Sequence, residues 1–184
     1  MSSHHVCPWW HAYTFDNPLR RLFHNPATML GDYVKPGMTV MDVGCGMGYF
    51  TIGMAKLVGE GGKVIAVDLQ QKMLDIMIRR AAKKELERRI VPVRARPDSI
   101  NYSDPVDFIL AFWMVHETPD PEIFFKDAES VLKPSAKLFY VEPAFHVTGK
   151  QYRKFLATAE KSGLTVSRDL TVRFSRGALL QRIG

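Results

Sequence analysis

Cysteine is scarce in this chain, and long apolar runs and export signals are missing. Its 184 residues contain only Cys7 and Cys45, and Cys45 lies in a glycine-rich stretch, so we predict no structural disulfide and a reducing, cytoplasmic environment. No apolar run approaches the roughly 20 residues of a membrane-spanning helix, and no basic-then-apolar signal opens the chain. Because no repeat, low-complexity segment or linker interrupts it, we expect one domain over residues 1–184 without a membrane partner.

Acidic residues are outnumbered by basic ones, 19 to 25, which gives a formal net charge of +6. Much of the excess lies in Arg79–Arg89, where Glu85 and Glu87 are interspersed and no aromatic residue occurs. A surface that stacks single-stranded bases would place aromatic side chains among the charges. We therefore predict that nucleic acid is not a partner, and that the basic side chains form a mostly solvated helix face: Arg79, Arg80, Lys83, Lys84, Arg88 and Arg89.

The stretch Thr39–Phe50, with the sequence TVMDVGCGMGYF, organises the rest of the chain. It begins as a β-branched, apolar run and ends in three glycines at alternate positions, Gly44, Gly46 and Gly48, before an apolar helical pattern. Glycines allow sharp turns and a close approach of ligand to backbone, and the start of a helix adds free N–H groups. This arrangement predicts a loop that cradles a ligand.

Two details narrow the identity of that ligand. A dinucleotide fingerprint would need its third glycine where the chain has Tyr49, and the pattern is instead D-x-G-x-G-x-G with Asp42 at its start. Val64–Asp68 predicts a second buried strand that ends in an acid, and a carboxylate there can accept hydrogen bonds from both hydroxyls of a ribose. The alternatives are that the glycines serve only the turn and that Asp68 only caps a helix.

At this point the chain resembles the class I S-adenosylmethionine (SAM) dependent methyltransferases, in particular their small UbiE-like members. VMDVGCGMGYFT is similar to their first motif, and VIAVDLQ to their second strand with its ribose-binding acid. The resemblance covers nearly all of residues 36–184. It implies SAM as cofactor, S-adenosylhomocysteine as product, and contacts to the cofactor from these residues: Asp42, Gly44, Cys45, Gly46, Gly48, Asp68 and Leu69.

Strands and helices alternate along the chain, which predicts an α/β, doubly wound Rossmann-like sheet with helices on both faces. The predicted strands are Thr39–Val43, Lys63–Asp68, Ile90–Arg94, Val106–Phe112, Lys137–Val141, Leu164–Arg168 and Phe174–Leu180. The predicted helices are Pro18–Phe23, Pro26–Tyr33, Tyr49–Val58, Gln71–Arg88, Pro121–Leu132 and Lys150–Ser162. The resemblance implies seven strands in the order 3-2-1-4-5-7-6 with the last antiparallel, and SAM at their carboxyl ends.

The segment after the third strand departs from the family. The family often has an acid followed by alanine there, in contact with the adenine amino group, but this chain has Arg96 at that position, with Ala95 before it. Either Asp98 or a backbone carbonyl then makes the adenine contact. The resemblance also implies that Phe112, at the end of the fourth strand, lies near the sulfonium.

Candidate catalytic residues follow the fourth and fifth strands. His116 is a candidate proton acceptor because its unperturbed pKa lies near working pH, and Glu142 stands at the mouth of the fifth strand. The alternative is a purely structural role for each.

We also expect residues 1–35 to form a lid in which Tyr13 and His11 approach the methyl group. The alternative is that the aromatic residues of this segment only cover the sheet edge. The spacing of His4, His5, Cys7 and His11 matches no zinc site, so we expect no metal.

No inserted recognition module is visible, which favours a small-molecule methyl acceptor and a monomer or homodimer. The alternatives are an RNA or protein methyltransferase and a non-catalytic, SAM-binding regulatory domain. The amino-methylating motif N/D-P-P-Y/F/W of the wider family is absent after the fourth strand, where Ala111–Met114 reads AFWM.

Overall fold

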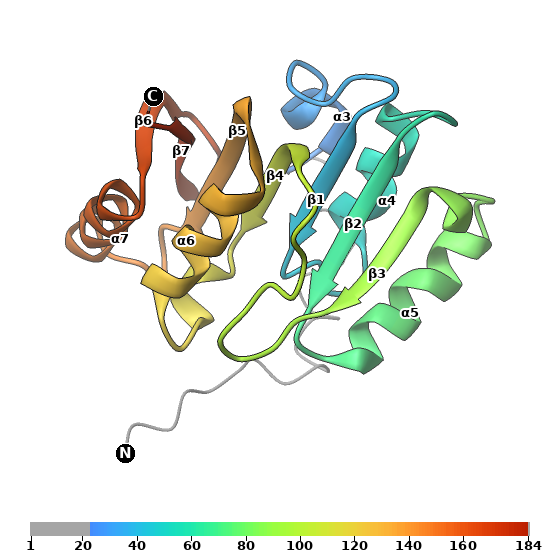
Figure 1. Cartoon of the computed structure of the whole chain (residues 1–184), viewed down its shortest axis with the longest axis horizontal. Helices are drawn as coiled ribbons and strands as arrows, with labels where there is room; N and C mark the ends of the chain where they lie inside the picture. Colours follow the sequence, from blue (N-terminus) through green and yellow to red (C-terminus); the bar gives the residue numbers. More distant parts are fainter. Residues whose placement is uncertain (1–22, 184) are drawn as a thin grey trace.

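In the computed structural model, the described residues 23–183 form a seven-stranded sheet in the order β3-β2-β1-β4-β5-β7-β6 (Figure 1). Strands β1 to β5 run parallel to one another, whereas β7 runs antiparallel to both β5 and β6. The predicted fold class and strand order are therefore confirmed. The strands are β1 (Thr39–Val43), β2 (Lys63–Asp68), β3 (Ile90–Arg94), β4 (Val106–Phe112), β5 (Leu132–Pro143), β6 (Leu164–Leu170) and β7 (Ser175–Arg182).

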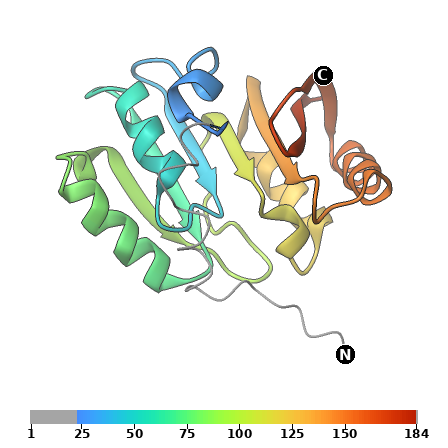
Figure 2. The same cartoon turned by 180° about the vertical axis from the view of Figure 1, so that it is seen from behind.

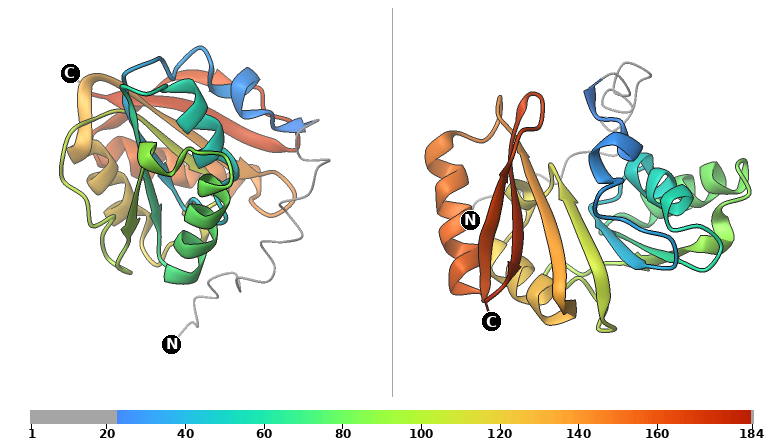
Figure 3. Two further views of the ribbon diagram at one scale, coloured as in Figure 1. Left: turned by 90° about the vertical axis from the view of Figure 1, so that its right-hand side faces the viewer. Right: turned by 90° about the horizontal axis from the view of Figure 1, so that it is seen from above.

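Helices cover both faces of this sheet (Figures 2 and 3). They are α3 (Pro26–Leu30), α4 (Tyr49–Leu57), α5 (Gln71–Ala82), α6 (Pro121–Val131) and α7 (Gly149–Lys161), with short 3-10 turns η2 (Glu87–Arg89) and η3 (Val115–Glu117). Side chains that begin these helices cap them: Asn25 accepts the Ala27 N–H, and Asp120 accepts the Glu122 N–H. Among residues 23–183, no helix is long and apolar enough to cross a membrane.

Two hydrophobic clusters lie on opposite faces of the sheet because side chains alternate along each strand. In β4, Phe108 and Leu110 pack with α3, α4 and α5, whereas Ile109 and Ala111 pack with α6 and α7. Strands covered on both faces must be apolar throughout, which explains the uninterrupted run VDFILAF in β4. The two faces also determine which residues can reach the site described below.

Several predicted boundaries were wrong. The helix predicted to reach Arg88 ends at Ala82, because Glu85 adopts φ = 55° and the Leu86 N–H turns back to the Ala81 carbonyl, which buries Leu86 in the core. The helix predicted over Pro26–Tyr33 ends at Leu30. The fifth strand, predicted as Lys137–Val141, extends from Leu132 to Pro143, since α6 passes into it without a loop.

Candidate functional site

The glycine loop leaves the carboxyl end of β1 and is held against β2 by backbone hydrogen bonds. The N–H groups of Gly44 and Cys45 both donate to the Val67 carbonyl, at 2.9 and 3.0 Å. The loop then enters α4, whose N-cap is Gly48 in the left-handed conformation. These bonds hold the loop beside the end of β2.

Each of the three loop glycines has a positive φ, but their surroundings differ. A Cβ on Gly44 would lie 2.7 Å from Met114 Cβ, and a Cβ on Gly48 would lie 2.4 Å from Met77 Cγ. A Cβ on Gly46 would meet no heavy atom within 4 Å, although Gly46 lines a cavity. Gly44 and Gly48 therefore allow close packing within the protein, whereas Gly46 leaves its space open on the cavity side.

Asp68, the acid at the end of β2, faces the same loop. Its Oδ2 accepts the Gly46 N–H and its Oδ1 accepts the Gln70 N–H, both at 2.9 Å. Burial raises the pKa of Asp68, because the charged form loses solvation, and the two N–H donors partly oppose that rise. An ionised carboxylate offers about four lone-pair sites, so Asp68 can still accept hydrogen bonds from two ligand hydroxyls.

Two further predicted cofactor-binding residues, Asp42 and Cys45, are buried. Asp42 is 3% exposed and accepts a hydrogen bond of 2.5 Å from Thr51 Oγ1, which ties β1 to α4. Burial raises the pKa of the Cys45 thiol well above its usual value, with smaller effects from Asp42 and Asp68. Cys45 is therefore a protonated, small side chain rather than a nucleophile.

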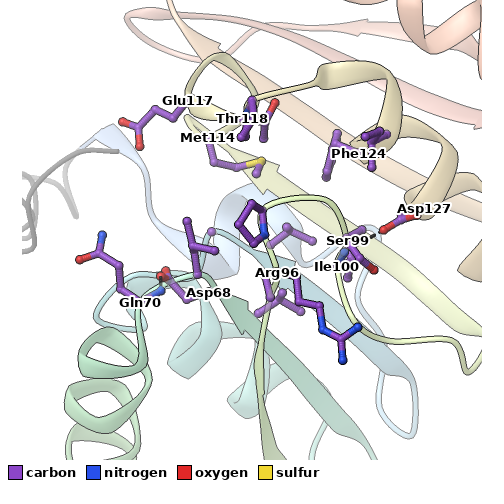
Figure 4. Close-up of a pocket in the computed structure, with 18 of the residues that line it drawn as sticks. Asp68, Gln70, Arg96, Ser99, Ile100, Met114, Glu117, Thr118, Phe124 and Asp127 are labelled. Atoms are coloured by element: carbon purple, nitrogen blue, oxygen red, sulfur yellow. Dashed lines mark hydrogen bonds between the residues drawn. The ribbon is translucent and has the colours of Figure 1, made fainter. Parts of the chain in front are cut away.

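A cavity of about 230 Å³ opens at the carboxyl ends of β1, β2 and β4 (Figure 4). Asp68 and Asp127 lie toward opposite sides of it in this view, with Arg96, Ser99 and Ile100 along the lower wall. The loop after β3, the turn after β4 and α6 supply most of the lining: Ala95, Arg96, Pro97, Ser99, Ile100, Trp113, Met114, Glu117, Thr118, Pro119, Asp120, Ile123, Phe124 and Asp127.

The predicted cofactor-binding residues divide into two groups. One group lines the cavity: Gly44, Gly46, Asp68, Leu69, Ala95 and Arg96. The other group lies outside the lining: Asp42, Cys45, Gly48 and Phe112. Asp98, the acid suggested as a substitute for the adenine contact, is exposed and is also outside the lining.

Phe112 lies on the other face of the sheet from the cavity. Its ring packs against Phe50 and His24, with centroid distances of 4.6 and 5.1 Å. The next residue, Trp113, has φ = 61° and donates its N–H to the Val141 carbonyl at 2.8 Å. This left-handed residue turns the chain at the end of β4, and Trp113 and Met114 line the cavity whereas Phe112 does not.

The structure brings the predicted pair His116 and Glu142 together. Glu142 is fully buried, and its carboxylate is hydrogen-bonded to His116 Nδ1 and accepts the His116 N–H at 3.3 Å. The His116 ring lies 4.9 Å from the His146 ring. Neither member of the pair lines the cavity, but Glu117 does, and its Oε1 is 3.8 Å from His116 Nε2.

Several predictions fall on residues 1–22, outside the part of the chain that the structure describes. These are the candidate catalytic residues Tyr13 and His11, the helix predicted from Pro18, most of the lid, and the histidines considered as metal ligands. Across residues 23–183, no group of three His, Cys, Asp or Glu side chains is placed to hold a metal ion.

Sequence reasoning missed the cavity residues of α6 and of the turn before it, above all Glu117 and Asp127. Glu117 follows His116 directly after the fourth predicted strand, so its place in the chain was a usable signal. Asp127 gave no such signal, because it lies in the middle of a helix far along the chain from the glycine loop. Only the packing of α6 against the loop after β3 brings it to the cavity.

Comparisons with known proteins agree with this arrangement. A family described as "Methyltransferase domain" matches residues 34–167. A demethylmenaquinone methyltransferase of Lactobacillus johnsonii is 33% identical over 110 residues, which cover 59% of this chain and 45% of that protein. The ubiquinone/menaquinone biosynthesis C-methyltransferase UbiE of Shewanella frigidimarina is 26% identical over 140 residues, 73% of this chain and 56% of that protein. The chain thus spans about half the length of the curated relatives it matches.

Among solved structures, a SAM-dependent methyltransferase from Aquifex aeolicus superposes with a TM-score of 0.87 at 27% sequence identity. That match covers 97% of this chain and 100% of the other. A putative rRNA methylase from Clostridium thermocellum has a TM-score of 0.66 at 19% identity, and it shows the shared fold alone. Together with the glycine loop, Asp68 and the strand order, these matches show that the chain belongs to the class I family of SAM-dependent methyltransferase domains.

Proposed function

We propose that this enzyme binds SAM in the cavity at the carboxyl ends of β1, β2 and β4 and methylates a small, apolar acceptor beside it. The observation that carries the proposal is that Gly46 and Asp68 meet through a hydrogen bond at the wall of one cavity. The loop backbone and the acid are thereby fixed relative to each other before any ligand arrives, which reduces the cost of ordering them on binding.

The residues present fit the chemistry of SAM. Gly46 leaves space where any other residue would place a Cβ, and Asp68 has lone pairs left for two ribose hydroxyls. Leu69, Ile100 and Met114 are among the apolar residues of the wall, and Met114 lies beside Gly44 of the glycine loop. When bound, SAM supplies a methyl carbon attached to a positively charged sulfur. The protein's part is to align an acceptor with that carbon and to exclude water.

The acceptor side is proposed from the aromatic residues next to Trp113. The Trp113 ring is fixed by its Nε1–H, which donates to Ser175 Oγ at 3.0 Å, and it contacts the Phe145 ring with centroids 5.5 Å apart. Phe145 is 68% exposed. Such a surface favours an apolar acceptor with a ring that can pack on aromatic faces. The names of the curated relatives, which refer to demethylmenaquinone and to ubiquinone/menaquinone biosynthesis, support the same class of acceptor.

A route for the acceptor's proton is proposed through Glu117, His116 and Glu142. Glu142 accepts from Nδ1–H, and this contact leaves a lone pair on His116 Nε2, which faces Glu117. Because 3.8 Å exceeds hydrogen-bond distance, a proton taken by the cavity-facing carboxylate of Glu117 can pass to Nε2 through one water, and the buried carboxylate of Glu142 stabilises the imidazolium that results. This route is needed only for an acceptor that loses a proton on methylation.

The test begins with calorimetry of SAM and S-adenosylhomocysteine, followed by a methyl-release assay over a panel of quinols, phenols and other small aromatic metabolites. We expect both nucleosides to bind and at least one ring-containing acceptor to be methylated. Binding of NAD without SAM would overturn the cofactor site. Turnover only with RNA or protein would overturn the small acceptor, and SAM binding without turnover on any substrate class would indicate a regulatory domain.

A further inference from the structure

The two ends of the cavity differ in what they offer a nucleoside. If the ribose binds at Asp68, as proposed above, and the methionine part lies along Gly44 and Gly46, the base extends toward the loop after β3 and α6. An adenine base presents an exocyclic amino group, which donates hydrogen bonds and needs an acceptor in a site that excludes water. At that end of the cavity, the acceptor must come from the loop after β3 or from α6.

The loop after β3 offers little to an amino group. Arg96 and Ser99 use their backbone groups on each other, with the Arg96 N–H donating to the Ser99 carbonyl at 2.9 Å and the Ser99 N–H donating back at 3.3 Å. The side chain of Arg96 is a donor and is exposed, and Asp98 is exposed and outside the cavity lining. The Ser99 hydroxyl already accepts the Asn101 N–H at 2.9 Å.

Helix α6 brings a carboxylate to the same end of the cavity. Asp127 lines the cavity and its Oδ2 accepts the Ile100 N–H at 2.7 Å, which joins the helix to the loop (Figure 4). Within residues 23–183, no Lys or Arg forms an ion pair with Asp127. Because a carboxylate has about four lone-pair sites and one is used by Ile100, Asp127 retains acceptor capacity at a fixed position.

We propose that Asp127 accepts the hydrogen bond of the adenine amino group and so determines the preference of this enzyme for a 6-aminopurine cofactor. The assignment rests on the proposed binding of SAM in this cavity. Helix α6 can supply this acceptor because no helix lies between β3 and β4, and the loop there contacts α6 directly through the hydrogen bond from the Ile100 N–H to Asp127. The acid proposed to contact the adenine amino group therefore lies after β4, whereas the family often has that acid after β3, where this chain has Arg96.

The test compares S-adenosylhomocysteine with its 6-deamino analogue, in which hydrogen replaces the amino group, by calorimetry. Wild-type protein should bind S-adenosylhomocysteine about tenfold more tightly than the analogue, as the loss of one hydrogen bond to a charged acceptor predicts. In Asp127→Asn, whose amide oxygen can still accept the Ile100 N–H, the two ligands should bind within about threefold of each other. The matched control, Asp98→Asn, should keep the wild-type preference.

The ratio of the two affinities separates recognition from folding, since a loss of stability weakens both ligands alike. Equal weakening of both in Asp127→Asn, or a preference that stays tenfold, would overturn the assignment while SAM binding stands. Should Asp127→Asn fail to fold, Asp127→Ser, whose hydroxyl can also accept from Ile100, must show the same loss of preference. Failure of wild-type protein to bind S-adenosylhomocysteine would overturn the proposed function and this assignment with it.

Discussion

At the scale of single residues, the loop glycines can be separated by substitution. Gly46→Ala and Gly48→Ala each place a side chain at positive φ, at a cost of roughly 1–2 kcal/mol in the free energy of unfolding. Gly48→Ala also drives a methyl group into Met77, which should cost about 1–3 kcal/mol more. In denaturant titrations, we expect Gly48→Ala to be the less stable variant. In calorimetry, we expect Gly46→Ala to lose more SAM affinity than Gly48→Ala, relative to the stability that each variant loses. Equal effects of both on affinity and stability would contradict this reading of the cavity.

Asp68 provides a second residue-scale prediction. Asp68→Ala should weaken SAM binding by roughly 1.5–3 kcal/mol, the cost of losing charge-assisted hydrogen bonds. The control is Asp75→Ala, which removes an exposed acid on α5 outside the cavity lining, and it should leave the affinity unchanged.

The pH dependence of the same site follows from its burial. Burial raises the pKa of Asp68, so the folded protein holds the ionised carboxylate less favourably than the unfolded chain does. At pH values above the folded-state pKa, this cost lowers the free energy of unfolding. Acidification through that pKa protonates the carboxylate and removes the cost. SAM affinity has the opposite trend, because only the carboxylate accepts from both hydroxyls. Affinity should fall on acidification, beginning at a higher pH than for an ordinary aspartate, and it should be flat in Asp68→Asn. A pH-independent wild-type affinity would contradict the ribose contact.

His116 is the third residue-scale prediction. With an acceptor that loses a proton, His116→Gln should reduce kcat by about 10²-fold or more, the usual contribution of general acid–base catalysis, while S-adenosylhomocysteine affinity stays unchanged. His146→Gln is the matched control, because the His146 ring packs beside the His116 ring, whereas the hydrogen bond to Glu142 is made by His116 Nδ1. A change in melting temperature alone would mark His116 as structural.

At the scale of elements, α5 does more than present charge to solvent. Arg79, Lys83, Lys84 and Arg88 are exposed, as predicted for a solvated face. Arg80 was predicted to belong to that face but is half-buried, and its Nη1–H donates to the Met47 carbonyl in the glycine loop at 3.0 Å. Arg89 likewise donates to the Ala55 carbonyl in α4 at 3.2 Å, so the basic segment fastens α5 to the glycine loop through Arg80 and η2 to α4 through Arg89.

Substitutions of the neighbouring residues Arg79 and Arg80 test whether the hydrogen bond from Arg80 to the glycine loop supports SAM binding. Arg80→Ala should weaken SAM binding by about 1 kcal/mol, since it removes a hydrogen bond that steadies the loop, whereas Arg79→Ala should leave binding unchanged. Calorimetry on both variants measures the difference.

Charge reversal at Lys83 and Lys84 tests the solvated face. RNA should bind the wild-type protein only weakly and in a salt-sensitive way, and the reversals should lower that weak affinity. Tight RNA binding at physiological salt that these reversals abolish would contradict the prediction.

At the scale of the whole molecule, we propose that the chain forms one methyltransferase domain with its N-terminal residues acting at the acceptor side. The exposed Phe145 and the cavity-lining Trp113 form an aromatic surface there. Deletion of residues 1–16 should leave the sheet folded, as judged by circular dichroism, while abolishing methyl transfer and weakening SAM binding. Unchanged methyl transfer by the truncated protein would rule out the lid. Tyr13→Phe then asks whether that hydroxyl contributes to turnover at constant SAM affinity.

The sequence alone determined the sheet and its glycine loop, because both depend on local signals. Buried strands such as Val106–Phe112 are apolar at every position, and a loop that needs positive φ must carry glycine. The bounds of β1 to β4 and the strand order therefore followed from pattern and resemblance. The ends of α5 and β5 did not, since the burial of Leu86 and the passage from α6 into β5 depend on packing between distant elements.

Tertiary structure alone decided which polar side chains share the cavity. Strand alternation sends Phe112 into the hydrophobic cluster on one face of the sheet, whereas Trp113 and Met114, beyond the end of β4, line the cavity. Asp127 reaches the base end only because α6 packs against the loop at Ile100. A sequence records residue spacing along the chain, but the distance between a helix carboxylate and a loop amide far before it depends on how the layers pack.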